Sequence, residues 1–267
     1  METLGLWSKT LPHPIAGFET PSNLLGVFCD IDDTLTIEGR LVPEVLVIMQ
    51  QAQQSGLRIV PITGRPAGWV DHIARAWPVD GVVGENGGLW FWLDGRQMQR
   101  RFLQSEGVRT ANREKLTRLA AHILDTVPGT ALASDQPYRE LDLAIDFCED
   151  VPALDEQAID AIVDAFHVAG ATAKVSSIHV NGWFGHFDKL EGVARFHQDR
   201  WGEEIDFSRW AFFGDSANDE PMFKAFPHSI GVANVVDFFP RMDHHPRWIT
   251  SGKGGHGFVE GMKQILG

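Results

Sequence analysis

The sequence has 267 residues, with 36 Asp and Glu against 23 Lys and Arg, so its formal net charge at pH 7 is −13. Hydrophobic residues make up 43 % of the chain and include 17 Phe and 9 Trp, which excludes a disordered composition and suffices for a sizeable core. So acidic a chain is not expected to bind nucleic acid, because such binding depends on clustered Lys and Arg. We see no apolar run of membrane-spanning length, no secretory signal and only two Cys, so we expect a reduced, cytoplasmic protein with no membrane partner.

The N-terminal part of the chain alternates short apolar runs with helical patterns. Strands are predicted at 24–29, 57–63 and 79–84, and helices at 43–55 and 66–77. Strands that alternate with helices form parallel sheets covered on both faces. This part is therefore predicted to be an α/β layer.

The pattern changes after Gly88. The Asp94-Gly95 pair between two β-prone runs predicts a hairpin, and helices and strands then alternate at 109–127, 141–147, 153–169 and 174–182. From about Phe187 the first pattern returns. We therefore predict an α/β fold: a Rossmann-like, doubly wound parallel-sheet core (1–87 and 186–267) with an inserted α+β cap domain (88–185).

Acidic residues follow the first predicted strand directly, in the order Asp30-Ile31-Asp32-Asp33-Thr34. Residues i and i+2 of an extended strand point the same way, so Asp30 and Asp32 are expected to project together. Two adjacent carboxylates repel unless a cation or a transferable proton lies between them. The pattern favours a nucleophilic carboxylate with Mg²⁺ and a neighbouring acid/base, and the alternative is a solvated acidic turn.

Three further motifs lie at predicted strand ends or helix starts. Thr63-Gly64-Arg65 offers a hydroxyl and backbone N–H groups to phosphate oxygens, although a Thr-Gly turn is also ordinary. Lys189 alone reads as a surface residue near a helix start. The loop Gly214–Asp219 suits a metal site with oxygen ligands, or a polar loop in which Ser216 or Asp219 caps the next helix.

Taken together, these motifs resemble those of the haloacid-dehalogenase-like hydrolase superfamily, most of whose members are Mg²⁺-dependent phosphatases. That family has a DxDx[TV] strand end, a Ser or Thr after the next strand, a Lys and a GDxxND loop. The corresponding residues here are Asp30–Thr34, Thr63, Lys189 and Gly214–Asp219. A large α/β cap between the second and third motifs marks the type IIB subgroup, which includes sucrose-phosphate, trehalose-phosphate and mannosyl-phosphoglycerate phosphatases. The turn Gly84–Gly88 resembles one common in that subgroup.

The resemblance implies a role for each motif. Asp30 would attack phosphorus, and Asp32 would protonate the leaving alcohol and then deprotonate the attacking water. Thr63 and Lys189 would bind the transferring phosphoryl oxygens. The implied cofactor is Mg²⁺, with the candidate ligands Asp30, Asp32 (through its backbone carbonyl), Asp215 and Asp219.

The insert would cover the site and contact the leaving group. The candidate substrate-binding residues, besides Thr63 and Lys189, are Gly64, Arg65, Asn86, His179, Asn181 and Asn218. His179 and Asn181 lie in the segment 176–183 and could suit a sugar. The alternative is that alternate residues of this strand pack the cap core, which is the favoured interpretation for Trp183.

The predicted function is a Mg²⁺-dependent phosphatase, a phosphoric monoester hydrolase that acts on a small phosphorylated metabolite through an aspartyl-phosphate. A sugar phosphate is the preferred substrate class. A phosphomutase on the same core and a catalytically silent phosphometabolite-binding or regulatory protein are the alternatives. The expected partner is the small substrate, and the expected state is a monomer or small homo-oligomer.

Overall fold

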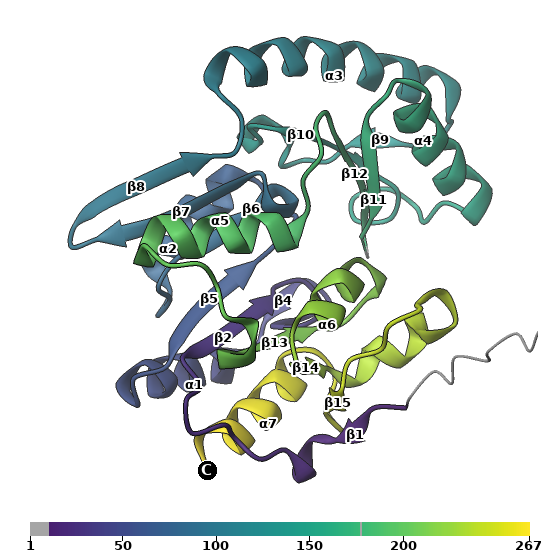
Figure 1. Ribbon diagram of the computed structural model, residues 1–267. Helices are drawn as coiled ribbons and strands as arrows, with labels where there is room; N and C mark the ends of the chain where they lie inside the picture. Colours follow the sequence, from purple (N-terminus) through teal and green to yellow (C-terminus); the bar gives the residue numbers. More distant parts are fainter. Residues whose placement is uncertain (1–10, 177) are drawn as a thin grey trace, which may run out of the picture. The chain divides into compact units, whose positions relative to one another are not determined.

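The computed structural model describes residues 11–176 and 178–267 (Figure 1). Contacts divide the chain into two compact units. The first unit contains the chain up to Leu57 together with Asp206–Gly267, and the second contains Arg58–Ile205.

The first unit is built on a parallel sheet. Its strands lie in the order β1-β15-β14-β13-β2, and each neighbouring pair is parallel. Their bounds are His13–Pro14 (β1), Gly26–Asp30 (β2), Trp210–Gly214 (β13), His228–Gly231 (β14) and Trp248–Ile249 (β15). All residues of β2 and β13 are buried, as expected of strands that are covered on both faces.

Helices and aromatic rings surround this sheet. The helices are α1 (Pro43–Gln54), α6 (Glu220–Ala225) and α7 (Gly254–Leu266), and a small hairpin is formed by β3 (Thr36–Ile37) and β4 (Arg40–Leu41). Short 3-10 turns are η1 (Ile15–Gly17), η4 (Phe207–Arg209), η5 (Ala217–Asp219) and η6 (Ala233–Arg241). Helix α1 packs against α7. The rings of Phe213 and Phe258 lie 4.9 Å apart and join the sheet to α7.

The second unit contains a smaller mixed sheet and a cap layer. The sheet has the order β5-β6-β7-β8, in which β5 and β6 are parallel and the other neighbours are antiparallel. Its elements are β5 (Arg58–Ile62), α2 (Ala67–Ala76), β6 (Val82–Gly84), η2 (Glu85–Gly87), β7 (Leu89–Asp94), β8 (Gln97–Phe102) and α5 (Lys189–Trp201). Helices α2 and α5 both contact β6 and β7.

The predicted hairpin at Asp94-Gly95 is present as β7–β8, but β7 pairs with β6 instead of with the cap sheet. The two units defined by contacts therefore have other bounds than the predicted core (1–87 and 186–267) and cap (88–185). These predicted domain bounds stay a prediction. Residues 1–10 of that core and Ser177 of that cap lie outside the described residues.

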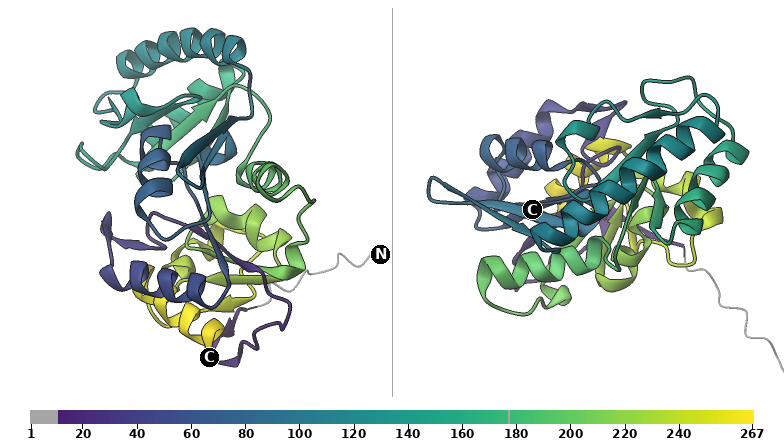
Figure 2. Two further views of the ribbon diagram at one scale, coloured as in Figure 1. Left: turned by 90° about the vertical axis from the view of Figure 1, so that its left-hand side faces the viewer. Right: turned by 90° about the horizontal axis from the view of Figure 1, so that it is seen from above.

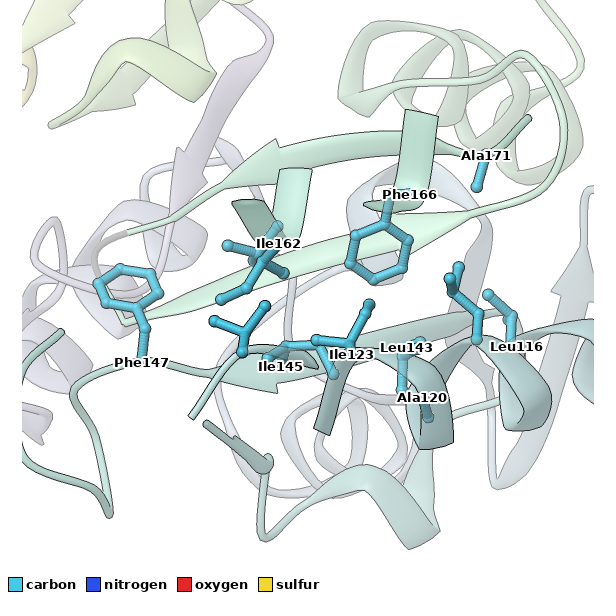
Figure 3. Close-up of a cluster of buried hydrophobic side chains, with 12 residues drawn as sticks. Leu116, Ala120, Ile123, Leu143, Ile145, Phe147, Ile162, Phe166 and Ala171 are labelled. Atoms are coloured by element: carbon cyan, nitrogen blue, oxygen red, sulfur yellow. The ribbon is translucent and has the colours of Figure 1, made fainter. Parts of the chain in front are cut away.

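The cap layer is an antiparallel sheet with the order β11-β12-β10-β9, covered by two helices (Figures 1 and 2). The elements are α3 (Glu106–Thr126), β9 (Ala131–Leu132), η3 (Gln136–Tyr138), β10 (Asp142–Asp146), α4 (Glu156–Val168), β11 (Thr172–Val175) and β12 (His179–Trp183). Figure 3 shows the apolar core between them, with Ile123 from α3, Ile145 from β10 and Phe166 from α4.

The opposite face of the cap sheet is polar although it is buried. Side chains alternate between the faces of a strand, so the residues next to core-facing Leu143, Ile145 and Val180 point the other way. The polar residues among them are Asp142, Asp146, His179 and Asn181, all at most 3 % exposed. Burial of so many polar groups requires partners on this face.

The predicted α/β fold class is confirmed: mostly parallel sheet strands with flanking helices carry an additional α+β cap layer. Among the described residues, no helix has both the length and the apolarity needed to cross a membrane.

Candidate active site

Three aspartates meet at the carboxyl end of the sheet in the first unit. Asp30 ends β2, Asp215 follows the neighbouring strand β13, and Asp219 ends η5. One carboxylate oxygen from each lies within 4.8 Å of the others, and all three residues are buried. The carboxyl ends of neighbouring parallel strands share one edge of the sheet, which explains why residues 185 positions apart converge.

Neutral groups orient these carboxylates. The Thr34 hydroxyl donates to Asp215 Oδ1 at 3.1 Å, and the backbone N–H of Asp215 donates to Asp219 Oδ2 at 3.1 Å. A Cβ on Gly214 would lie 2.5 Å from the same Asp219 oxygen, so glycine is required for that approach. The amide of Asn234 donates to the Asp33 carbonyl at 3.0 Å and to Asp215 Oδ2 at 3.4 Å. The carboxylates of Asp215 and Asp219 are therefore held in position by several segments.

The chemistry of this donor set fits a divalent cation. Mg²⁺ prefers hard oxygen ligands and is usually held by one or two carboxylates together with water and substrate oxygens. Three carboxylates this close repel one another, and a cation among them relieves that repulsion. Asp30, Asp215 and Asp219 are the residues that would hold it.

The other predicted residues of this unit lie around the cluster's loops. Asp32 is half-buried in the turn after β2, where the Ile31 carbonyl accepts from the N–H groups of residues 34–36. Asp33 takes φ +56° in this turn. Asn218, in η5, accepts a hydrogen bond at 2.9 Å from the hydroxyl of Ser216, the residue that precedes η5.

The remaining predicted residues belong to the second unit, and most of them surround the loop after β5. Thr63 is fully buried, and its hydroxyl accepts from the Arg65 N–H at 2.9 Å. Asn86 Nδ2 is buried and has no hydrogen-bond partner within the described residues. The Asn86 amide also packs on Gly64, where a Cβ would lie 3.2 Å from its oxygen.

Lys189 is the first residue of α5 and is 5 % exposed. Asp188 caps this helix, because its carboxylate accepts from the Glu191 N–H at 2.9 Å. A Cβ on Gly87, which has φ +99°, would overlap the Asp188 carbonyl. The backbone at the start of α5 therefore contacts the backbone of the turn η2 directly, with no side chain between them.

Arg65 is tied to acids of the cap layer. Its guanidinium lies 3.0 Å from Glu149 and 3.5 Å from Asp135. His179 Nε2 lies 2.8 Å from the other oxygen of Glu149. The contact with His179 and the charge of Arg65 outweigh the burial of Glu149 and lower the pKa of its carboxyl to about 2.

Arg139 forms a second buried cluster. Its Nη1 lies 2.9 and 3.1 Å from the two carboxylate oxygens of Asp142 and donates to the Gly64 carbonyl at 2.9 Å, and its Nη2 donates to Asp135 at 3.0 Å. The Asn181 amide donates to Asp142 at 3.0 Å. Burial raises the pKa of Asp142, and the charge of Arg139 opposes this.

The structure thus brings Asp30, Asp215 and Asp219 together in one unit, and Thr63, Gly64 and Asn86 in the other. Arg65, His179 and Asn181 each contact an acidic side chain of the cap layer. Trp183 stacks on Phe187 with ring centroids 5.2 Å apart, which agrees with its packing interpretation.

Sequence reasoning missed several functional groups. Asn234 follows β14, a further parallel strand end, so its position was a usable signal. The alternation of apolar and acidic residues in β10 was a signal for Asp142. The sequence carried no signal that Arg139 reaches the Gly64 carbonyl or that Glu149 reaches Arg65, because these partners lie 75 and 84 residues away.

The comparisons with known proteins agree with this architecture. Residues 27–120 match the family model described as haloacid dehalogenase-like hydrolase. No curated protein matches the chain. A similar solved structure is that of Thermoplasma acidophilum 0175, with 18 % identity and a TM-score of 0.70 over 91 % of this chain and 98 % of that one.

Two similar structures have stated activities. The sucrose-phosphatase of Synechocystis sp. PCC6803 has 14 % identity and a TM-score of 0.64, over 91 % of this chain and 98 % of that one. The subclass IIB sugar phosphatase BT4131 has 14 % identity and a TM-score of 0.61, over 90 % and 98 %. Residues 27–120 therefore match the model of the haloacid dehalogenase-like hydrolase family, and the chain has the fold of the solved subclass IIB sugar phosphatase.

Proposed function

We propose that this protein is a Mg²⁺-dependent phosphatase that hydrolyses a small phosphorylated metabolite, with a sugar phosphate as the substrate class. The observation that carries the proposal is the buried cluster of Asp30, Asp215 and Asp219 at the carboxyl ends of neighbouring strands. The family match and the phosphatase neighbours support the same reaction class.

In this proposal Asp30 attacks phosphorus and forms an aspartyl-phosphate, while Asp32 gives a proton to the leaving alcohol oxygen. Asp32 then takes a proton from the water that hydrolyses the intermediate. Bound Mg²⁺ supplies positive charge that stabilises the transferring phosphoryl group.

Thr63 and Lys189 bind the phosphoryl oxygens in the proposed reaction. Lys189 supplies a positive charge, and the loop Thr63-Gly64-Arg65 supplies a hydroxyl and backbone N–H groups. Asn218 supports the loop of Asp215. Thr63, Lys189 and Asn218 come from separate segments of the chain, and we propose that they act on the same phosphoryl group.

The polar face of the cap layer supports a sugar as the leaving group. His179 and Asn181 lie on that face, and the same unit holds a buried amide donor, Asn86 Nδ2, that lacks a partner among the described residues. A polyhydroxylated ligand supplies acceptors and donors to such groups. We further propose that the protein works in the cytoplasm as a monomer or small homo-oligomer.

The test is a broad panel of phosphorylated metabolites, assayed for inorganic phosphate with Mg²⁺ and with EDTA. We expect release of phosphate from at least one sugar phosphate, and loss of this activity with EDTA. Asp30→Asn should be inactive on an aryl phosphate and retain the wild-type circular dichroism spectrum. Phosphoryl transfer to another hydroxyl without free phosphate would replace the proposal by a phosphomutase, and absence of any turnover would favour a binding protein.

A further inference from the structure

The carboxylate of Glu85 joins two segments of the second unit. Glu85 is fully buried, and its Oε1 accepts from the N–H groups of Ala67 at 3.0 Å and Glu140 at 2.8 Å. Its Oε2 accepts from Leu141 at 2.6 Å and Asp142 at 3.3 Å. One side chain therefore connects the first turn of α2 with the cap segment 140–142.

The backbone beside this carboxylate holds the loop after β5. The Glu85 N–H donates to the Arg65 carbonyl and the Asn86 N–H donates to the Thr63 carbonyl, both at 3.1 Å. Glu85 and Asn86 take φ +45° and +55°, a left-handed conformation that non-glycine residues rarely adopt. Because this conformation costs free energy, it persists only where surrounding contacts impose it.

The same turn touches the start of α5. A Cβ on Gly87 would overlap the Asp188 carbonyl, and a Cβ on Gly192 would overlap the Gly87 backbone. A displacement of the turn therefore moves the backbone next to Lys189 as well as that of Thr63. Both proposed phosphoryl-binding residues depend on one turn.

We propose that Glu85 is a positioning residue for the phosphoryl-binding groups, which transmits the placement of cap segment 140–142 to Thr63 and Lys189 through the turn 85–87. This inference rests on the proposed function of Thr63 and Lys189. The four backbone N–H donors hold the Glu85 carboxylate in place, and the carboxylate holds the left-handed turn 85–87. The turn in turn positions the loop 63–65 and the start of α5.

The charges around Glu85 fit this role. Burial and the neighbouring Asp142 raise the pKa of Glu85 to about 8, while Arg139 and the backbone donors oppose the shift. Arg139 also donates to the Gly64 carbonyl at 2.9 Å, so the same cluster reaches the Thr63 loop a second time. The cap segment and the loop are thus linked by two contacts, one through Glu85 and one through Arg139.

The test compares Glu85→Gln with Asp80→Asn. Asp80 is the control, because it is a half-buried carboxylate of the same unit that also joins two segments: its Oδ2 accepts from the Ile59 N–H at 2.8 Å. For Glu85→Gln we expect KM for an aryl phosphate and the dissociation constant of inorganic phosphate with Mg²⁺ to rise about tenfold, the loss of about one hydrogen bond, because the Gln amide offers one acceptor oxygen where the carboxyl group offers two. For Asp80→Asn we expect both constants to stay within about twofold of wild type, within the spread of ordinary variants.

Hydrogen exchange gives a readout that does not need turnover. In Glu85→Gln, exchange should quicken in peptides that cover 63–65 and 188–192 as well as 140–142. Ala67→Pro removes one of the four donors at the first turn of α2, where proline is tolerated, and should shift the same peptides to a smaller extent.

Faster exchange confined to 140–142, with unchanged KM and phosphate binding, would overturn the positioning role. A wild-type chain without phosphatase activity would instead contradict the proposed function, and the exchange and phosphate-binding data would still decide the role of Glu85.

Discussion

Asp30, Asp215 and Asp219 are the residues on which the chemistry depends, and their mutual distance makes a prediction about stability. Three buried carboxylates within 4.8 Å repel one another in the metal-free protein. Their negative charge should therefore destabilise the folded protein without a cation and bind the cation when one is present. Replacing one of the three carboxylates by a neutral group should separate the effect on stability from the effect on cation binding.

We predict that Asp215→Asn leaves the melting temperature without metal equal to or above that of wild type, but abolishes the increase that Mg²⁺ produces in wild type. Thermal unfolding with EDTA and with millimolar Mg²⁺ measures both effects. Asp206→Asn is the control, because Asp206 is an exposed aspartate of the same unit with the same charge change. An unchanged Mg²⁺ response in Asp215→Asn would remove Asp215 from the metal site.

Thr34 makes a second prediction, since its fully buried hydroxyl donates to Asp215. Thr34→Val keeps the shape of the side chain and deletes this donor. We expect a loss of about 1–3 kcal/mol in the free energy of unfolding and a loss of about 10–100-fold in Mg²⁺ affinity. Denaturant unfolding and a Mg²⁺ titration of activity check the two numbers. Wild-type affinity in the variant would show that this hydrogen bond does not orient the carboxylate.

The positions of candidate site residues that directly follow a strand could be predicted from the sequence. Those of the residues that contact them or their loops could not. Asp30, Thr63 and Asp215 each stand at the end of an apolar run, which is a local pattern. Arg139 and Glu149 act through the Gly64 carbonyl and Arg65, and no local pattern identifies a partner so far along the chain.

At the scale of elements, the turn η2 and helix α5 meet at a glycine. We predict that Gly87→Ala lowers the free energy of unfolding by more than about 2 kcal/mol, because the Cβ would both strain a positive φ and overlap Asp188. Gly170→Ala is the control: Gly170 also has positive φ, but a Cβ there meets nothing within 4 Å. Its cost should stay near 1 kcal/mol in the same urea titration. Equal costs would mean that the backbone contact is unimportant.

The pKa of Glu85 predicts the pH dependence of the second unit. A folded-state pKa of about 8 lies above the usual value of 4.5, so the folded protein binds this proton more tightly than the unfolded chain. The corresponding stability is fully present below about pH 4.5 and is lost as the pH rises through 8. Wild type should therefore lose stability between pH 5 and 8 relative to Glu85→Gln, measured by urea unfolding. A parallel pH dependence of the two proteins would contradict the raised pKa.

Helices and strands could be predicted where neighbouring residues in the sequence determine them. The Asp94-Gly95 turn identified β7 and β8, yet turn chemistry does not specify which strand pairs with β7, and the structure pairs it with β6. Strand β1 was missed because two residues that include a proline have no periodicity, and only the pairing with β15 defines it.

At the scale of the whole molecule, the net charge of −13 opposes the approach of an anionic substrate. We therefore predict that kcat/KM for a phosphate monoester rises, by about two- to threefold, when KCl increases from 10 to 150 mM at constant Mg²⁺, because salt screens the repulsion. A steep fall in kcat/KM with salt would show that the positive groups near the site dominate the long-range field.

The architecture as a whole was the most predictable level, because apolar runs alternating with helical patterns allow few arrangements besides a covered, mostly parallel sheet. The division into units was less predictable. It depends on which segments touch: Asp142 contacts Glu85, which is 57 residues away, and Glu149 contacts Arg65, which is 84 residues away.

The most direct test of the account is detection of the phosphorylated Asp30. In Asp32→Asn the base that assists hydrolysis is lost, whereas the aryl oxide of an aryl phosphate leaves readily without a proton, so the intermediate should accumulate. Acid quenching during turnover of an aryl phosphate with Mg²⁺, followed by mass spectrometry of the peptide that contains Asp30, measures this. We predict one added phosphoryl group on Asp30 in Asp32→Asn, and none when EDTA is present. Turnover by wild type without any phosphorylated Asp30 in the variant would contradict Asp30 as the nucleophile.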